Sequence, residues 1–503
     1  MKFLRKTALF LVLALLVSSM MFSCKDKENE IDRDGWWLSD AGGRPSTPDD
    51  LPENIDFEGY EFLVFYRAGD WVNFYECEGN YDTDVNPVYQ TVYERNLKVQ
   101  SRLNAKITWV PSDNGGLNET ASQITQILNS AEYYDFFLTT NNTCVSKGNN
   151  AQMIDFSLSQ YINLSQPWWW KDVIEEISFD GTTINFLVGD MNIINITKMS
   201  AFYFNSDLID ERLRKTPSYF YDLVDEKKWT IEILDQLAKD CYKDLNGNQS
   251  EDENDSYAFP WTGGETVNQF LWSTRVADDL YTRSADGRFI TLNFKGNDDI
   301  VTLCEQMTKL LHNNVGVLNY SSKPSGTFDG LIVQEFSEGK YVFLPQRLSA
   351  ATTDYMRDME TDYGIIPYPL MSEGDEYISD IQDSSTCIFA PRVADRVNDK
   401  ISTCIEALCA EAYRYTTEAF YNVALKNKYA RDDDASRMID LIYESAHKSF
   451  IVEYGGQASS IAGTLYSAVY GQSSVATAIA GKADAAEASI NKFISDTLKT
   501  MYS

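Results

Sequence analysis

Hydrophobic positions in the first third of the chain alternate between two periods, which predict strands and helices in turn. A continuous apolar run at 60–66 predicts a buried strand, and amphipathic patterns predict helices at 88–103 and 118–130. Further strands are predicted at 106–110 and 134–139. This strand–helix–strand–helix–strand order indicates a parallel sheet with right-handed crossovers. Ligands of such sheets meet the loops after the carboxyl ends of the strands.

A second strand and helix pattern begins near residue 200. The stretch 201–204 predicts a strand, and apolar residues spaced by three and four predict a helix that begins after Thr230 and runs to about Asp244. Thr230 is a favourable cap for that helix. A chain of 503 residues is too long for one hydrophobic core, so two lobes are expected.

The N-terminal residues have the pattern of a secretory signal. Basic residues precede an apolar run at 8–17 that is too short to span a bilayer. Ser23 and Cys24 then resemble a bacterial lipobox, so we expect a signal peptide over 1–23 and lipidation of Cys24. The alternative is an ordinary secretory signal with a chance cysteine. Residues 24–57 are polar, acidic and rich in Pro and Gly, which predicts a disordered tether.

Charge and composition exclude several functions. The formal net charge is -32 at pH 7, which is the wrong sign for a nucleic-acid binder. Two histidines leave little for histidine-based catalysis or metal binding. The cysteines form no CxxC pair, so neither a zinc site nor a disulfide framework is indicated. No nucleophile elbow, HExxH or P-loop motif is present.

A twelve-residue window at 244–255 has oxygen-bearing side chains at the spacing of a calcium loop. Gln249 stands where such loops need glycine, and the last position is an aspartate rather than the longer glutamate. We expect a structural calcium ion here; the alternative is an Asp/Asn-rich surface turn without metal. The candidate ligands are Asp244, Asn246, Asn248, Ser250, Asp252 and Asp255.

The same stretch carries a resemblance. The tryptophan-led helix from Trp229, the D-L-N-G sequence at Asp244 and the S-Y-A-F sequence that follows resemble the extracellular solute-binding proteins of family 1, in their lipoprotein form. The P-W-W-W run at 167–170 and the G-I-I-P-Y-P run at 364–369 are also similar to that family. With these, the resemblance extends over most of the mature chain.

The resemblance implies an α/β fold of the two-lobed periplasmic-binding-protein type. Each lobe would be a parallel-type sheet flanked by helices, with a multi-strand hinge and a helical C-terminal region. We expect the first lobe to comprise 58–197 plus 345–385, and the second lobe 198–344 plus 386–503.

The expected ligand site is the cleft between the lobes. Carboxylate, amide and guanidinium groups bind sugar hydroxyls, and an indole face covers the apolar face of a pyranose. For Trp272, packing in the core remains the alternative. The candidates are Arg67, Asp70, Asn142 and Asp190 from the first lobe, Trp261 and Trp272 from the second, and Arg347 near the hinge.

The implied function is capture of a carbohydrate, an oligosaccharide above all, and its delivery to the permease of an ABC transporter. Such a protein needs no catalytic residue and no cofactor, and we expect a monomer anchored outside the cell. The alternatives are a secreted carbohydrate-active enzyme, which needs a pair of carboxyl groups, or a surface sugar sensor.

Overall fold

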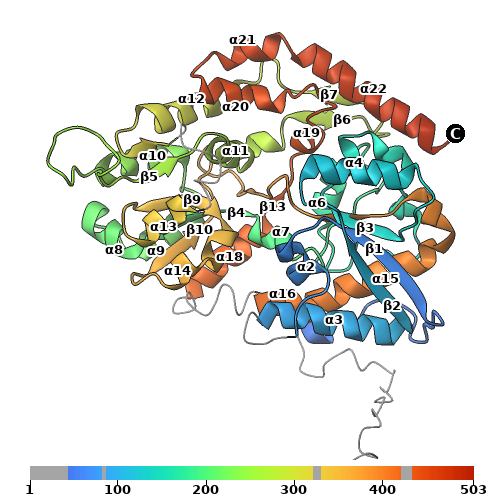
Figure 1. The fold of residues 1–503 in the computed structure, drawn as a ribbon. Coiled ribbons are helices and arrows are strands. Elements are labelled where there is room, and N and C mark those ends of the chain that lie inside the picture. The colour runs from blue at the N-terminus through green and yellow to red at the C-terminus, as the bar shows by residue number, and fades with distance from the viewer. Residues whose placement is uncertain (1–43, 82–86, 321–329, 421–432) are drawn as a thin grey trace, which may run out of the picture.

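The computed structural model describes residues 44–81, 87–320, 330–420 and 433–503. Figure 1 shows two α/β lobes side by side, with the C-terminal helices lying over both. Among the described residues, no helix combines the length and the apolar character that crossing a bilayer requires.

The first lobe is built on a four-stranded sheet in the order β12-β3-β1-β2. Strands β1 (Tyr60–Tyr66), β2 (Ala105–Pro111) and β3 (Phe136–Thr139) are parallel, and β12 (Cys387–Phe389) is antiparallel to β3. The predicted parallel order of the first three strands is therefore confirmed. Helices α3 (Pro87–Leu103) and α4 (Leu117–Leu128) make the crossovers.

The second lobe is built around β4 (Ser200–Asn205), which is antiparallel to both of its neighbours, β9 (Phe343–Arg347) and β10 (Tyr363–Ile366). The amide of Phe343 donates to the carbonyl of Ala258 at 2.7 Å. This bond continues the sheet toward β5 (Phe259–Trp261), which is parallel to β8 (Val317–Asn319). The second lobe thus has an antiparallel three-stranded sheet beside a parallel pair of strands.

Helix α10 (Ile231–Cys241) shows how local sequence sets an element of this lobe. Thr230 caps it, its hydroxyl accepting from the amide of Ile233 at 3.2 Å, as predicted. Leu234, Ala238 and Cys241 are buried on one face. The helix ends earlier than Asp244. The other helices of this lobe are α8 (Ser206–Leu208), α9 (Pro217–Asp225), α11 (Gly264–Trp272), α12 (Asp298–Asn313), α13 (Leu331–Ser337) and α14 (Asp354–Arg357).

The predicted division into lobes differs from the strand pairing at two places. Residues 345–385 were expected in the first lobe, but β10 lies within them and pairs with β4. Residues after 386 were expected in the second lobe, but β12 pairs with β3, and α15 (Asn398–Glu411) packs on α3. A strand pattern indicates that a strand forms, whereas the sheet it joins depends on long-range packing.

The tether expected over 24–57 is also too long, because residues from 44 onward pack on the first lobe. The carboxylate of Asp49 lies 2.7 Å from the guanidinium of Arg102 and 2.8 Å from that of Arg414. Leu51 is buried in the core. The expected signal peptide and Cys24 lie outside the described residues.

The chain crosses between lobes where two segments run side by side. Helix α7 (Ile194–Thr197) leads into the first crossing, and Met199 forms a β-bridge with Ile381 on the return crossing. The amide of Gln382 donates to the carbonyl of Lys198 at 3.2 Å. The strand β11 (Ser379–Asp380) pairs with β13 (Ala446–His447) beside them.

The C-terminal helices span both lobes. Helix α20 (Ala462–Tyr470) packs on α11 and α12 of the second lobe, whereas α22 (Ala483–Met501) also packs on residues 149–152 of the first lobe. Figure 1 shows α20, α21 and α22 along the top of the molecule. The remaining elements are α2 (Asp70–Glu76), α5 (Asn142–Val145), α6 (Lys171–Glu176), β6 (Tyr281–Arg283), β7 (Ile290–Leu292), α16 (Thr417–Phe420), α18 (Asp433–Glu444), α19 (Phe450–Glu453) and α21 (Val475–Ala480).

Candidate ligand-binding site

A cavity of about 60 Å³ lies between the lobes, beside the crossing segments. Its second-lobe wall comes from α11 and the end of β9, and its opposite wall comes from α19. Helix α19 packs on the first lobe, where the hydroxyl of Tyr454 donates to the carbonyl of Ile177 at 2.8 Å. The lining residues are Glu265, Asn268, Trp272, Arg347, Asp380, Ile381, Gln382, Asp383, Ser449, Val452 and Glu453.

The sequence of α11 presents one face to this cavity. Glu265, Asn268 and Trp272 are spaced by three and four residues, so they lie along the same side of the helix. The preceding turn needs Gly263, whose φ is +78°. Glu265 accepts a hydrogen bond from Arg347 Nη2 at 2.9 Å, which joins the start of α11 to the end of β9.

Several polar groups of this cavity are buried without a partner. Arg347 Nε, Ser449 Oγ and Glu453 Oε2 have no hydrogen-bond partner among the described residues. Asp380 is 8% exposed, and burial raises the pKa of its carboxyl group to about 7, against the opposing influence of Arg347. Buried polar groups left unpaired cost free energy, so these groups on both walls favour a polar partner over an apolar one.

A cationic cluster continues from the cavity toward the first lobe. The ammonium of Lys198 lies 4.7 Å from the ring of Trp71, and the guanidinium of Arg67 lies 5.4 Å from it. Lys198 also donates to Ser384 Oγ at 2.7 Å. Burial lowers the pKa of Lys198 to about 7, and the nearby positive charge of Arg67 adds to this. Aromatic, cationic and carboxylate groups therefore meet at the junction of the lobes.

The predicted site residues divide into two groups. Trp272 and Arg347 line the cavity, and Arg67 lies in the adjoining cluster, where Asp383 is close enough to oppose the lowering of its pKa by burial. Asn142 begins α5 directly after the crossover loop from β3 and is half-buried. Asp70 begins α2 and is exposed.

Asp190 and Trp261 lie elsewhere. The carboxylate of Asp190 is fully buried and accepts from Trp170 Nε1 at 3.0 Å and Thr417 Oγ1 at 2.8 Å. Burial raises its pKa, and its bonds are made inside the protein. Trp261 is 1% exposed, and its ring packs 4.8 Å from that of His312. Neither residue lines the cavity, so both differ from the expectation.

Sequence reasoning missed Asp380, Gln382, Asp383, Lys198 and Glu453. The first four flank the crossing segments. Residues next to a lobe crossing lie close to the interlobe cleft, because the crossing segments connect the two lobes that border it. Nothing in the local sequence marks Glu453 as a neighbour of the cavity.

The acidic loop at 244–255 makes its own hydrogen bonds. Asp244 accepts from the amides of Gly247 at 2.6 Å and Gln249 at 2.8 Å, and Asp255 accepts from the amide of Leu245 at 3.1 Å. Among the described residues, no group of three or more Asp, Glu, His or Cys side chains is placed to hold a metal ion. The structure therefore does not support the expected calcium ion at Asp244, Asn246, Asn248, Ser250, Asp252 and Asp255.

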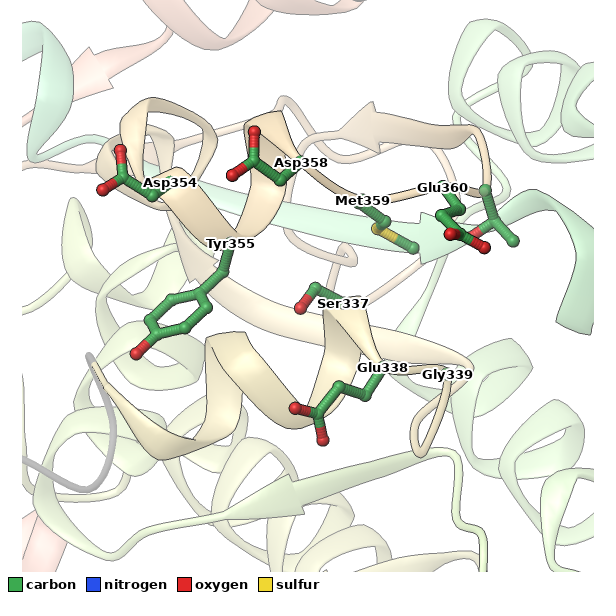
Figure 2. Close-up of a pocket in the computed structure, with 9 residues that line it drawn as sticks. Ser337, Glu338, Gly339, Asp354, Tyr355, Asp358, Met359 and Glu360 are labelled. Atoms are coloured by element: carbon green, nitrogen blue, oxygen red, sulfur yellow. The ribbon is translucent and has the colours of Figure 1, made fainter.

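A larger hollow, of about 580 Å³, lies on the second lobe alone, between α13 and α14. Figure 2 shows Asp354, Tyr355 and Asp358 on one side of it and Ser337 and Glu338 on the other. It is a surface hollow with acidic sides, and none of the described residues of the first lobe lines it. It therefore does not correspond to the expected interlobe site.

Comparison with known proteins bears on the fold. No family model matches the sequence, and no curated protein matches it either. Solved structures do match over most of the chain. A family 1 extracellular solute-binding protein from Bifidobacterium longum subsp. infantis is 14% identical, covers 86% of this chain and 98% of its own, and has a TM-score of 0.52.

The chain has the fold of a solute-binding protein. Two further structures agree with this. The sugar-binding protein MalE from Xanthomonas citri is 11% identical, with 87% of this chain and 98% of that chain covered and a TM-score of 0.53. The cyclic alpha-maltosyl-1,6-maltose binding protein from Arthrobacter globiformis is 13% identical, with 87% and 100% covered and a TM-score of 0.52. The expected two-lobed α/β fold is confirmed.

Proposed function

We propose that this protein is an exported solute-binding protein that captures a carbohydrate between its lobes and delivers it to the permease of an ABC transporter. One observation carries the proposal: the interlobe cavity is lined from both walls by buried polar groups without partners, Arg347 Nε, Ser449 Oγ and Glu453 Oε2. A solute that pairs with these groups links the two lobes and stabilises their closed arrangement.

The chemistry of the lining favours a carbohydrate. Carboxylate and guanidinium groups form charge-assisted hydrogen bonds with hydroxyls. Trp272 lines the same cavity, and an indole can pack on the apolar face of a sugar ring. The ligand in the name of the Arthrobacter protein, a cyclic maltosyl-maltose, is an oligosaccharide. We therefore propose an oligosaccharide, bound without chemical change and without a cofactor.

Anchoring and location are part of the same proposal. Ser23 and Cys24 follow an apolar signal-like run, and we propose that Cys24 carries the lipid that holds the protein at the outer face of the membrane. A Cys24→Ala variant should then appear in the soluble fraction. Retention of this variant in the membrane with its N-terminus unprocessed would instead mean an uncleaved anchor.

A thermal-shift screen against an oligosaccharide library tests the binding function. A bound sugar stabilises the folded state by mass action and so raises the melting temperature. At a sugar concentration of 100 times Kd, the gain in unfolding free energy is about 2.7 kcal/mol. Arg347→Ala should reduce the shift, whereas Arg288→Ala, on an exposed turn, should keep it. Sugar recovered from the protein should be chemically unchanged. If no sugar in the library raises the melting temperature of the wild type, the proposal is contradicted. Recovery of cleaved sugar would indicate a carbohydrate-active enzyme instead.

A further inference from the structure

The hairpin of β6 and β7 belongs to the second lobe by sequence but sits on the first lobe. The guanidinium of Arg283 donates to the carbonyls of Ser178 at 2.6 Å and Glu176 at 3.1 Å, at the carboxyl end of α6. The last carbonyls of a helix lack intrahelical donors and carry partial negative charge. Arg283 thus caps a first-lobe helix from the other lobe.

The turn of this hairpin lies against the first-lobe backbone. Gly287 has φ of +68°, and a Cβ there would lie 1.8 Å from the carbonyl oxygen of Asp180. On its outer side the hairpin is backed by α22, where Asn491 Nδ2 donates to the carbonyl of Ile290 at 2.7 Å. Figure 1 shows β6 and β7 beneath α22, at the junction of the lobes. The hairpin is therefore held from both sides.

The same contact reaches the wall of the ligand cavity. Glu176 Oε1 accepts from the hydroxyl of Tyr281 at 2.7 Å and from the amide of Phe450 at 3.2 Å. The rings of Tyr281 and Phe450 lie 4.9 Å apart. Phe450 is the first residue of α19, which also carries Glu453 of the cavity lining. One carboxylate thus links the hairpin to the cavity wall.

We propose that the β6–β7 hairpin is an interlobe clasp, and that Arg283 and Glu176 are positioning residues that hold α19 against the ligand cavity. The inference rests on the proposed function and adds to it a control of affinity from outside the cavity. Contacts made across the two lobes favour the arrangement in which the lobes are together. The ligand then binds a state that is already populated, and its apparent affinity rises.

The experiment compares Arg283→Ala with Arg288→Ala, an exposed arginine on the same turn. Spin labels at Ser122→Cys on α4 and Asp222→Cys on α9, both exposed positions, report the interlobe distance in the chain without ligand. A Cys24→Ser background keeps label and lipid away from the N-terminus, and the seven cysteines of the described residues are buried. Calorimetric titration with maltotriose, mannotriose and cellotriose measures affinity.

Arg283→Ala should broaden the interlobe distance distribution toward longer distances and weaken binding by about 5- to 150-fold, the usual range of coupling between sites. Arg288→Ala should match the wild type in both. An unchanged distance distribution, or a broadened one with unchanged affinity, overturns the clasp.

A milder variant guards against misfolding. If Arg283→Ala does not fold, Tyr281→Phe removes only the hydroxyl that bonds Glu176 and keeps the ring against Phe450; the same two readouts then decide. Failure of the wild type to bind any of the three sugars counts against the proposed carbohydrate function. The distance measurement without ligand still decides on the clasp, so the two failures are distinguishable.

Discussion

Arg347, at the end of β9, and Glu265, in the first turn of α11, form an ion pair in which Arg347 Nη2 lies 2.9 Å from Glu265 Oε2. The arginine side chain is 6% exposed and the glutamate 46%. Glu265 therefore orients a buried guanidinium from the solvent side. Arg347 Nε is left without a partner among the described residues, so the pair presents a fixed donor to the interlobe cavity.

Replacement of Arg347 should weaken carbohydrate binding more than it weakens the fold. Arg347→Ala removes the donor, and we expect a loss of at least about 1.4 kcal/mol of binding free energy, which is at least a tenfold rise in Kd. Arg347→Lys keeps the charge but loses the planar fork, so an intermediate affinity is expected. Calorimetric titration with the sugar found in the screen checks this order. Equal affinity of all three proteins would exclude Arg347 from the site.

Replacement of Trp261 and replacement of Trp272 should have different effects on stability and on Kd. Trp261 is buried against His312 and Tyr470 away from the cavity lining, so Trp261→Ala should cost about 3–5 kcal/mol of unfolding free energy with little change in Kd. Trp272 lines the cavity, so Trp272→Ala should raise Kd as well. Urea unfolding and titration give the two quantities. A rise in Kd for a well-folded Trp261→Ala variant would show that Trp261 belongs to the ligand site after all.

The elements that could be predicted from sequence are those set by local periodicity. The strand at 60–66 and the helix capped by Thr230 lie where the apolar pattern places them. Their signals arise from neighbouring residues on one face, so no knowledge of the rest of the fold is needed.

The sequence placed β10 in the first lobe and Asp190 in the ligand site, and the structure differs on both for the same physical reason. Both depend on contacts between residues far apart in sequence. Asp190 follows a strand-like run, as a ligand-binding residue would, yet Tyr443 and Thr417 bond its carboxylate from the C-terminal region. Trp272 and Arg347, the last residues of α11 and β9, do line the interlobe cavity, and their role in binding stays a prediction. Glu453 was not predicted, because α19 reaches the cavity only through tertiary packing.

Asp49 should be essential to the stability of the first lobe. Its carboxylate is 1% exposed and bonds Arg102 and Arg414. Burial alone would raise its pKa, but the hydrogen bonds and charges of the two arginines outweigh burial and lower it.

Asp49→Ala leaves both guanidiniums without this partner, and the expected cost is about 3–5 kcal/mol. Because the folded pKa is depressed, the contribution is present above the unfolded value of 3.8 and is lost as pH falls through the folded one. Unfolding at pH 7 and pH 3 should therefore show a smaller difference between variant and wild type at pH 3. Asp50→Ala, at the neighbouring exposed aspartate, is the matched control.

Asp380 should make the ligand-free protein less stable as pH rises. Burial raises the pKa of its carboxyl group from 3.8 to about 7, so the folded state binds the proton more tightly than the unfolded state. Stability from this group is full below about pH 4 and is lost as pH rises to about 7. The loss is at most about 4 kcal/mol, because one pKa unit corresponds to about 1.4 kcal/mol.

Asp380→Asn should remove that loss, since the amide carries no charge to bury. Glu76 and Glu406 also have raised pKa values, of about 7 and about 8, so only the difference between variant and wild type isolates Asp380. Without ligand, the variant should be more stable than the wild type at pH 8 and equal to it at pH 4. With sugar the advantage of the variant should shrink, because the ionised carboxylate accepts from hydroxyls more strongly than an amide does. Parallel stability profiles from pH 4 to pH 8 would show that Asp380 does not titrate in this range, and a gain of affinity in the variant would remove it from the binding site.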